Sequence, residues 1–211
     1  MSKEITVEQG SDEWFAARLG IATASRYKDI MARTPAPKAN YSAELVAERL
    51  TGQREDGYKS ADMQWGNDYE PVARLTYKLN NPDKKVRDCG IFLHDKIACG
   101  ASPDGLVDDD GTIEIKCPKT ATHIQTLKSG KLPAQYFWQV QGQLWVTGRA
   151  WCDFISYDPR LPENASYICI RVERDDAKIE LLEKAVKYFM QQVKDDTELL
   201  KGFNSVRLER V

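Results

Sequence analysis

The stretch from Asp104 to Lys116 constrains the fold more than any other part of the chain, because it has the pattern of a β-hairpin. Residues 108–111, with the sequence Asp-Asp-Asp-Gly, form a strong hairpin-turn signal. Such a turn would fold the segment around Asp104 back against a strand at residues 112–117. The sequence therefore predicts an antiparallel pair of strands with Asp104 at its open end.

Charged side chains gather on one face of that predicted strand. Side chains of a strand alternate between two faces, so Glu114 and Lys116 should project in the same direction, beside Asp104. The residues expected to enter a core on the opposite face are Ile113, Ile115 and Cys117. Carboxylate oxygens are ligands that Mg²⁺ prefers, and a lysine can orient or help deprotonate a water molecule or stabilise a phosphate. This set is suited to metal-assisted phosphodiester hydrolysis.

Each part of this pattern also has an ordinary explanation. Glu-x-Lys on a strand usually marks a solvated face, and Pro-Asp-Gly usually marks a turn. Arg18 and Ser25 lie near a predicted helix start, which suits a phosphate site but also suits a simple cap beside a surface arginine. Glu70 and Gln139 fit the polar faces of helices. Chemistry and spacing alone leave these alternatives open.

The composition indicates a folded domain. The chain has 211 residues, 42% of them hydrophobic and 29% charged, which favours one globular domain over residues 1–211. No apolar run approaches the ~18 residues that a membrane span needs, and the polar start has no signal-peptide core. The net charge of −2 means that any nucleic-acid binding must rely on locally concentrated basic residues.

The cysteines indicate a reducing environment. There are five of them, an odd number, and none forms a Cys-x-x-Cys pair. Reduced thiols in a cytoplasmic protein fit this pattern best, and a zinc or iron–sulfur site does not.

Hydrophobic periodicity and turn residues predict the elements. Helices are expected at residues 11–18, from Thr23 or Ser25 to 33, and at 41–50, 61–79, 122–127, 135–146 and 176–200. Strands are expected at 85–93, 97–101, 106–107, 112–117, 151–157 and 167–172. A loop is predicted at 34–37, and Pro71 predicts a break or a new helix start near Glu70. The five tryptophans are expected in the core. These elements predict an α/β or α+β domain with helices flanking a central mixed sheet.

The order Pro-Asp…Glu-x-Lys resembles the signature of restriction-endonuclease-like nucleases, and the chain as a whole resembles the phage lambda exonuclease family. The segments that carry this resemblance, between about residues 8 and 175, are 14–25, 65–70, 102–105, 114–118, 139–146 and 157–160. The resemblance implies a restriction-endonuclease-like fold with a central mixed sheet, in a single nuclease domain.

The resemblance also implies roles for individual residues. The implied Mg²⁺ ligands, which Mn²⁺ could also use, are Asp104, Glu114 and the carbonyl of Ile115. Lys116 would serve the attacking water, Glu70 would be an extra acid near the metal, and Gln139 would line the site. The implied pocket for a DNA 5′ phosphate consists of Arg18, Ser25 and Ser102.

The family degrades one strand of linear double-stranded DNA from its 5′ end. It does so processively, as a ring-shaped homotrimer, leaves 3′ single-stranded tails, and works beside a single-strand-annealing protein in recombination. The resemblance implies the same activity and partners here, with no membrane involved. Two alternatives remain: a RecB-like helicase-associated or CRISPR-associated nuclease, and a catalytically inactive DNA-binding module. The scattered cysteines disfavour the first, which often carries a four-cysteine iron–sulfur cluster, and the full set of acids and lysine disfavours the second.

Overall fold

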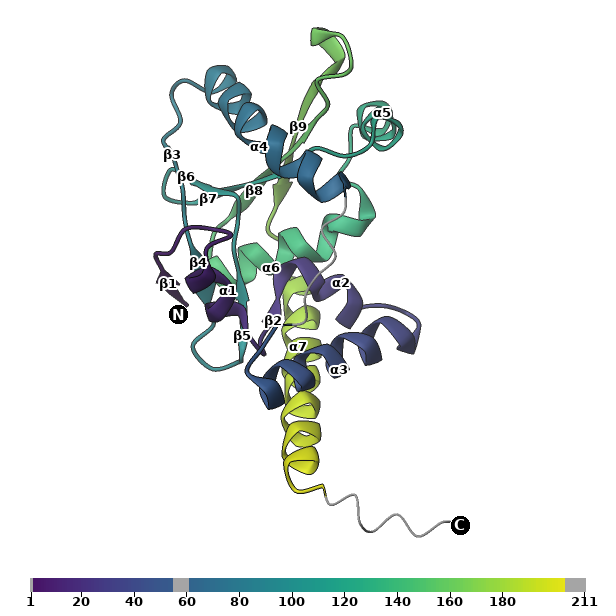
Figure 1. Ribbon diagram of the computed structural model, residues 1–211. Coiled ribbons are helices and arrows are strands. Elements are labelled where there is room, and N and C mark those ends of the chain that lie inside the picture. The colour runs from purple at the N-terminus through teal and green to yellow at the C-terminus, as the bar shows by residue number, and fades with distance from the viewer. Residues whose placement is uncertain (1, 55–60, 204–211) are drawn as a thin grey trace.

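Two β-sheets organise the chain in a computed structural model, which describes residues 2–54 and 61–203 (Figure 1). The small sheet has the strand order β1-β4-β5-β2. Its strands are β1 (Lys3–Ile5), β2 (Ala22–Thr23), β4 (Ile91–Leu93) and β5 (Cys99–Ala101). Sequence reasoning missed β1 and β2, because strands of three and two residues carry almost no alternation.

The large sheet has the strand order β3-β6-β7-β8-β9. Its strands are β3 (Val86–Arg87), β6 (Gly105–Val107), β7 (Gly111–Lys116), β8 (Trp151–Tyr157) and β9 (Tyr167–Glu173). Only the β7–β8 pair is parallel, and the other pairs are antiparallel. The prediction of mixed α/β architecture is confirmed.

Seven α-helices surround these sheets in the described ranges. They are α1 (Asp12–Arg18), α2 (Tyr27–Ile30), α3 (Pro35–Thr51), α4 (Ala61–Asn80), α5 (Thr120–Ser129), α6 (Phe137–Thr147) and α7 (Asp176–Lys201). Short 3₁₀ turns occur at η1 (Ala24–Arg26), η2 (Ala134–Tyr136) and η3 (Glu163–Ala165). In the part of the chain that the structure describes, no helix is long and apolar enough to cross a membrane.

The large sheet is covered on both faces. On one face, Ala73 and Tyr77 of α4 pack against Ile113 and Ile115, as predicted for the apolar side of β7. On the other face, Val140 and Leu144 of α6 pack in one cluster with Cys152 and Phe154 of β8. The polar side of β7 is therefore also enclosed.

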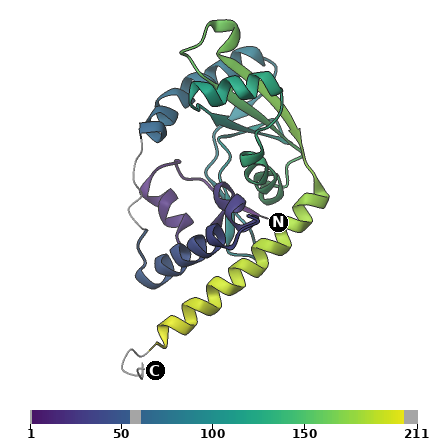
Figure 2. The same ribbon diagram turned by 90° about the vertical axis from the view of Figure 1, so that its right-hand side faces the viewer.

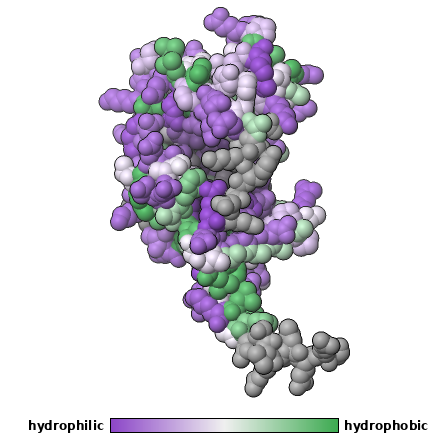
Figure 3. All heavy atoms as spheres, in the orientation of Figure 1, coloured by the Kyte–Doolittle hydropathy of each residue, from purple (hydrophilic) through white to green (hydrophobic). Residues whose placement is uncertain are grey.

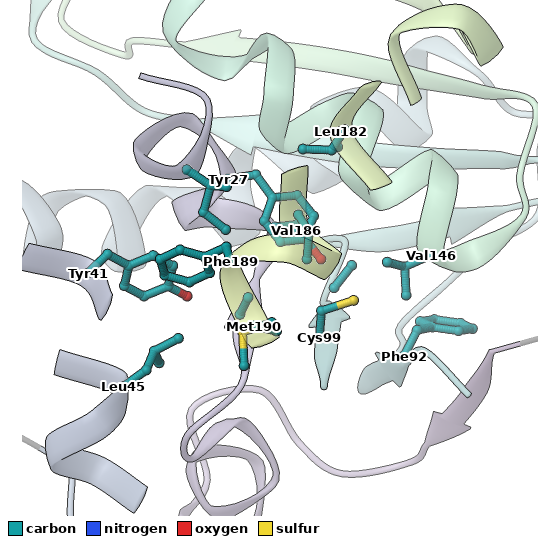
Figure 4. Packing of buried hydrophobic residues seen from close by; sticks show 14 of the residues in the cluster. Tyr27, Tyr41, Leu45, Phe92, Cys99, Val146, Leu182, Val186, Phe189 and Met190 are labelled. Carbon is teal, nitrogen blue, oxygen red and sulfur yellow. The ribbon is translucent and has the colours of Figure 1, made fainter. Parts of the chain in front are cut away.

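A second core joins α7 to α2, α3 and the small sheet (Figure 4). The ring of Phe189 on α7 stacks on Tyr41 of α3 at a centroid distance of 5.4 Å. The buried face of α7 follows the helical spacing seen in the sequence. Figure 2 shows that the C-terminal part of α7 extends beyond the rest of the molecule.

Two proline-based predictions are wrong. The predicted loop at 34–37 is the first turn of α3, with Pro35 at its start. Proline is tolerated there because the first amides of a helix have no intrahelical partner. The predicted break near Glu70 is absent, since α4 runs without interruption through Pro71. Packing of Ala73 and Tyr77 on the large sheet stabilises the helix beyond the proline.

Two element boundaries also differ from the prediction. The helix expected from Thr23 or Ser25 to residue 33 is instead η1 followed by the four-residue α2. The strand expected at 85–93 is two strands, β3 and β4, in different sheets. The chain crosses between the sheets near Gly90, where a Cβ would lie 2.0 Å from the Ile5 carbonyl oxygen. Only glycine permits this close approach.

A short connector at residues 102–104 links β5 of the small sheet to β6 of the large sheet. Gln9 Nε2 and Cys89 Sγ donate to the Pro103 carbonyl at 2.7 and 3.3 Å. Trp14 Nε1 donates to Ser102 Oγ at 2.9 Å. Because proline also restricts its own φ angle, the connector is held in one conformation.

Gly142→Ala is expected to destabilise the protein. A Cβ at Gly142 in α6 would lie 2.3 Å from the ring of Tyr27. Overpacking of this kind costs roughly 1–3 kcal/mol, which exceeds the gain of about 1 kcal/mol from helix propensity. The matched control is Gly66→Ala in α4, where nothing lies within 4 Å of the added atom, and it should stabilise. The free energy of unfolding from urea titrations measures both effects, and equal stabilities of Gly142→Ala and wild type would contradict the prediction.

Candidate active site

The predicted hairpin is present, and it fixes Asp104 against β7. Strands β6 and β7 pair antiparallel, with Gly105 opposite Ile113. The turn includes Asp108 at a φ of 46°. The Asp104 amide donates to the Ile113 carbonyl at 3.1 Å, and Asp104 Oδ2 accepts from the Ile115 amide at 2.6 Å. One carboxylate oxygen is therefore anchored to the neighbouring strand.

Glu114 is fully buried beneath α6 and has hydrogen-bond partners at both carboxylate oxygens. Its Oε1 lies 2.5 Å from Lys116 Nζ and accepts from Gln139 Nε2 at 2.5 Å. Its Oε2 accepts from Gln143 Nε2 at 2.5 Å. Gln143 was missed by sequence reasoning, where the glutamines of this helix looked like ordinary polar-face residues.

The electrostatics of Asp104 and Lys116 are strongly coupled to Glu114. Burial, followed by repulsion from Glu114, raises the pKa of Asp104 well above its usual value. Burial alone would lower the pKa of Lys116, but attraction to Glu114 and Asp104 outweighs it and raises that pKa. The Lys116 ammonium group therefore lies beside both carboxylates, where it can donate to a water or to a phosphate oxygen.

Glu70 lies on α4 at the edge of this group. Its Oε1 accepts from Arg74 Nη2 at 2.9 Å, and its charge contributes to the raised pKa of Asp104. Arg74 can pack against the backbone at Gly105 because this residue has no side chain. A Cβ there would lie only 2.9 Å from Arg74 Nη1. Glu70 therefore lies near the Asp104–Glu114 pair, as the resemblance implies.

A cavity of about 600 Å³ opens beside Lys116. Its lining includes Glu70, Ile115, Lys116, Lys119, Tyr136, Arg160 and Trp65. The Arg160 guanidinium donates to the buried Asp158 carboxylate at 2.7 Å and to the Pro118 carbonyl at 3.0 Å. It also stacks over Trp65 at 4.2 Å. Trp65 is therefore part of a cavity wall, and the prediction that it lies in the core is wrong.

A second polar cluster contains Arg18, Ser25 and Ser102, together with Trp14 and Thr23. Arg18 stacks over the Trp14 ring at 3.9 Å, and the Trp14 indole donates to Ser102 Oγ. Arg18 Nη2 lies 3.5 Å from Thr23 Oγ1, which is 3.4 Å from Ser25 Oγ. The structure thus links the three residues that the resemblance groups together. It adds Trp14 and Thr23, which sequence reasoning did not assign to this cluster.

The guanidinium of Arg18 has an unusually low pKa for an arginine. Burial lowers the pKa of its guanidinium to about 10. Within the described residues, no carboxylate forms an ion pair with Arg18. Because η1 has only three residues, the expected helix N-terminus contributes little, and the donors here are side chains. A partly buried cation without an acidic partner is suited to binding an anion.

The residues around Asp104 fit a divalent cation. Asp104 and Glu114 supply two carboxylates against one lysine, and a cation would offset the remaining negative charge. Among the residues that the structure describes, no three His, Cys, Asp or Glu side chains are grouped to hold a metal ion by themselves. Mg²⁺ commonly binds one or two carboxylates and keeps several waters, so this small set with a backbone carbonyl suits Mg²⁺.

Comparison with known proteins identifies the family. The profile of the YqaJ-like viral recombinase domain matches residues 13–150, well over half of the chain. The chain belongs to this family. The matched range includes the proposed metal-site residues Asp104, Glu114 and Lys116, and also Arg18, Ser25 and Ser102. No curated protein sequence matches the chain significantly.

Solved structures agree with this assignment. The alkaline exonuclease LHK-Exo from Laribacter hongkongensis is 49% identical, with a TM-score of 0.86. The same exonuclease in complex with dAMP gives 0.87, and each comparison covers 90% of this chain and 96% of that chain. A phage related exonuclease from Haemophilus somnus is 14% identical, with a TM-score of 0.66 over 86% of this chain and 95% of that chain, and shows the fold alone. The resemblance to the lambda exonuclease family and the restriction-endonuclease-like fold are confirmed.

Proposed function

We propose that the protein is an Mg²⁺-dependent exonuclease that digests one strand of linear double-stranded DNA from its 5′ end. The observation that carries this proposal is the convergence of Asp104, Glu114 and Lys116 beside a cavity, in a chain that is 49% identical to an alkaline exonuclease. Digestion in this direction leaves 3′ single-stranded tails, which are substrates for recombination.

Asp104, Glu114 and the Ile115 carbonyl would hold Mg²⁺, or Mn²⁺ in its place. When bound, the metal supplies Lewis-acid stabilisation of the phosphate and a more acidic water. Lys116 would donate from its ammonium group to the attacking water or to a phosphate oxygen. Gln139 holds Glu114 in place, and Glu70 adds negative charge at the edge of the site.

The cluster of Arg18, Ser25 and Ser102 supports the proposed 5′-to-3′ polarity. Arg18, with Ser25 and Ser102, offers a guanidinium and two hydroxyl groups to a terminal phosphate. Ser102 lies two residues before Asp104, so the phosphate pocket and the metal-binding acids are adjacent in the chain. A strand would therefore enter the site with its 5′ phosphate first.

The decisive experiment compares linear and closed circular duplex DNA in Mg²⁺. The linear duplex, labelled at either its 5′ or its 3′ end, should lose the 5′ label first, and the circular duplex should stay intact. Cleavage of the circle would indicate an endonuclease and contradict the proposal. Loss of the 3′ label first would contradict the polarity.

The two alternatives have less support. A RecB-like helicase-associated or CRISPR-associated nuclease is disfavoured by the match to viral recombinases and by five cysteines that lie in separate places along the fold. An inactive DNA-binding module is disfavoured by the complete set of acids and lysine. Absence of digestion of every linear duplex in Mg²⁺ or Mn²⁺ would favour the inactive module.

The proposed assembly is a homotrimer that encircles the DNA. A net charge of −2 gives little general attraction for phosphates, whereas a closed ring retains its substrate by topology. Apolar surface gathers on the projecting part of α7 (Figure 3), including Leu199, which is 68% exposed. A cavity of about 750 Å³ lies between this part of α7 and α3. In the proposed trimer, this apolar surface would contact a different surface of the next subunit. A heterologous interface repeated in this way can close a ring.

Light scattering should therefore report a mass three times that of the 24.0 kDa chain. Digestion should also continue on the first DNA molecule when unlabelled competitor is added during the reaction. A monomeric mass together with free redistribution onto the competitor would contradict the ring.

The proposed setting is recombination in the cytoplasm, where the five cysteines, none of which forms a disulfide, would stay reduced. The proposed partner is a single-strand-annealing protein that loads onto the 3′ tail. Co-purification of such a protein with the trimer, but not with a monomeric interface variant, would support the partnership.

A further inference from the structure

The structure points to Gln143 as a positioning residue for the metal site, an inference that rests on the proposed Mg²⁺-dependent function. We propose that the Gln143 amide holds Oε2 of Glu114 toward the protein interior, so that Glu114 turns only Oε1 toward the metal. This arrangement would make the site favour Mg²⁺ over Ca²⁺.

The two oxygens of Glu114 have different surroundings. Oε1 contacts Lys116, which lines the cavity, and Gln139, which is only partly buried. Oε2 faces the interior, where it accepts from Gln143, a residue that is 1% exposed. Oε1 is thus the oxygen on the side of the cavity.

The amide of Gln143 is itself incompletely satisfied. Its Oε1 is buried and has no hydrogen-bond partner among the described residues. A buried carbonyl without a partner lowers the stability of the fold. At this atom, an apolar residue of similar size would therefore cost less folding free energy. The N–H group of the same amide, in contrast, has a clear role, because it bonds to Oε2 of Glu114.

The orientation of the Glu114 carboxylate has a consequence for the choice of metal. Ca²⁺ takes six to eight oxygen ligands and often binds a carboxylate through both oxygens, whereas Mg²⁺ demands octahedral geometry and keeps several waters. Binding through both oxygens requires both of them to face the metal, and the bond from the buried Gln143 amide holds Oε2 on the side away from the cavity. Gln143 would therefore disfavour Ca²⁺ more than Mg²⁺.

The test is calorimetric titration of the full-length protein with Mg²⁺ and with Ca²⁺, without DNA. Gln143→Met keeps the length and approximate volume of the side chain but removes the N–H donor. The matched control is Gln141→Met on the same helix, because Gln141 is equally buried and bonds to the Glu173 carbonyl and the Asp175 amide. Melting without metal establishes that each variant folds, and Gln143→Leu serves if Gln143→Met does not.

We expect Gln143→Met to weaken Mg²⁺ binding by about 10- to 100-fold, the usual effect of losing a partner of a metal ligand. Ca²⁺ binding should weaken less, so that the preference for Mg²⁺ narrows, while Gln141→Met leaves both affinities unchanged. Equal effects of the two variants, or an unchanged preference in Gln143→Met, would overturn the inference alone. Failure of the wild type to bind Mg²⁺ would overturn both this inference and the proposed metal site.

Discussion

Asp104→Ala is expected to lower the rate of DNA digestion by at least about 1,000-fold. The substitution removes one of two carboxylates proposed to hold the metal, whose charge stabilisation is worth several kcal/mol, and each 1.36 kcal/mol is a factor of ten in rate. Glu114→Ala and Lys116→Ala should have comparable effects, because the three side chains act as a unit. Single-turnover digestion of a labelled linear duplex measures the loss.

The control for Asp104→Ala is Asp109→Ala, which removes an exposed acid from the turn of the same hairpin and should retain activity. Asp104→Ala should remain folded, because the change also relieves repulsion between Asp104 and Glu114. A folded Asp104→Ala variant that digests DNA at a near-normal rate would refute the assignment of the metal site.

Arg18→Ala is expected to abolish the preference for 5′-phosphorylated ends. Hydrogen bonds to a charged group contribute about 1.5–3 kcal/mol each, so the loss should be roughly 10- to 100-fold on phosphorylated ends and small on hydroxyl ends. Initial digestion rates on the two kinds of end, at saturating Mg²⁺, measure the difference.

Arg26 provides the matched control for Arg18. It also stacks over an aromatic ring, that of Tyr41 at 4.2 Å, but it is already paired with Asp29 and Glu44. Arg26→Ala should therefore keep the preference for phosphorylated ends. Equal digestion of both ends by the wild type would remove the phosphate pocket altogether.

The hairpin site could be predicted because its information is local. Alternation along residues 112–117 determines which side chains share a face, and the turn at 108–111 determines which segment lies beside them. Gln143 could not be assigned in this way. Its contact with Glu114 depends on how α6 docks across the large sheet. Gln143 lies one helical turn after Gln139, and no pattern in the sequence shows whether such a side chain bonds to Glu114 or faces solvent.

The fold was predictable where long elements dominate. The spacing of apolar residues identified α7, and the alternating or apolar runs identified β7, β8 and β9. The errors fall where tertiary packing outweighs local preference. Pro71 lies inside a helix that the large sheet stabilises, and β4 separates from β3 because the chain crosses between two sheets at Gly90.

The connector at residues 102–104 fixes the distance between the proposed phosphate pocket and the proposed metal site. Ser102 and Asp104 are two residue steps apart, which spans at most about 7 Å, and Pro103 is fixed at both its ring and its carbonyl. A strand seated by its terminal phosphate would therefore be cut at one constant backbone distance, whatever its bases. Hydrolysis that releases the 3′ oxygen leaves a phosphate on the shortened strand. Each cycle would thus remake the end that the next cycle needs.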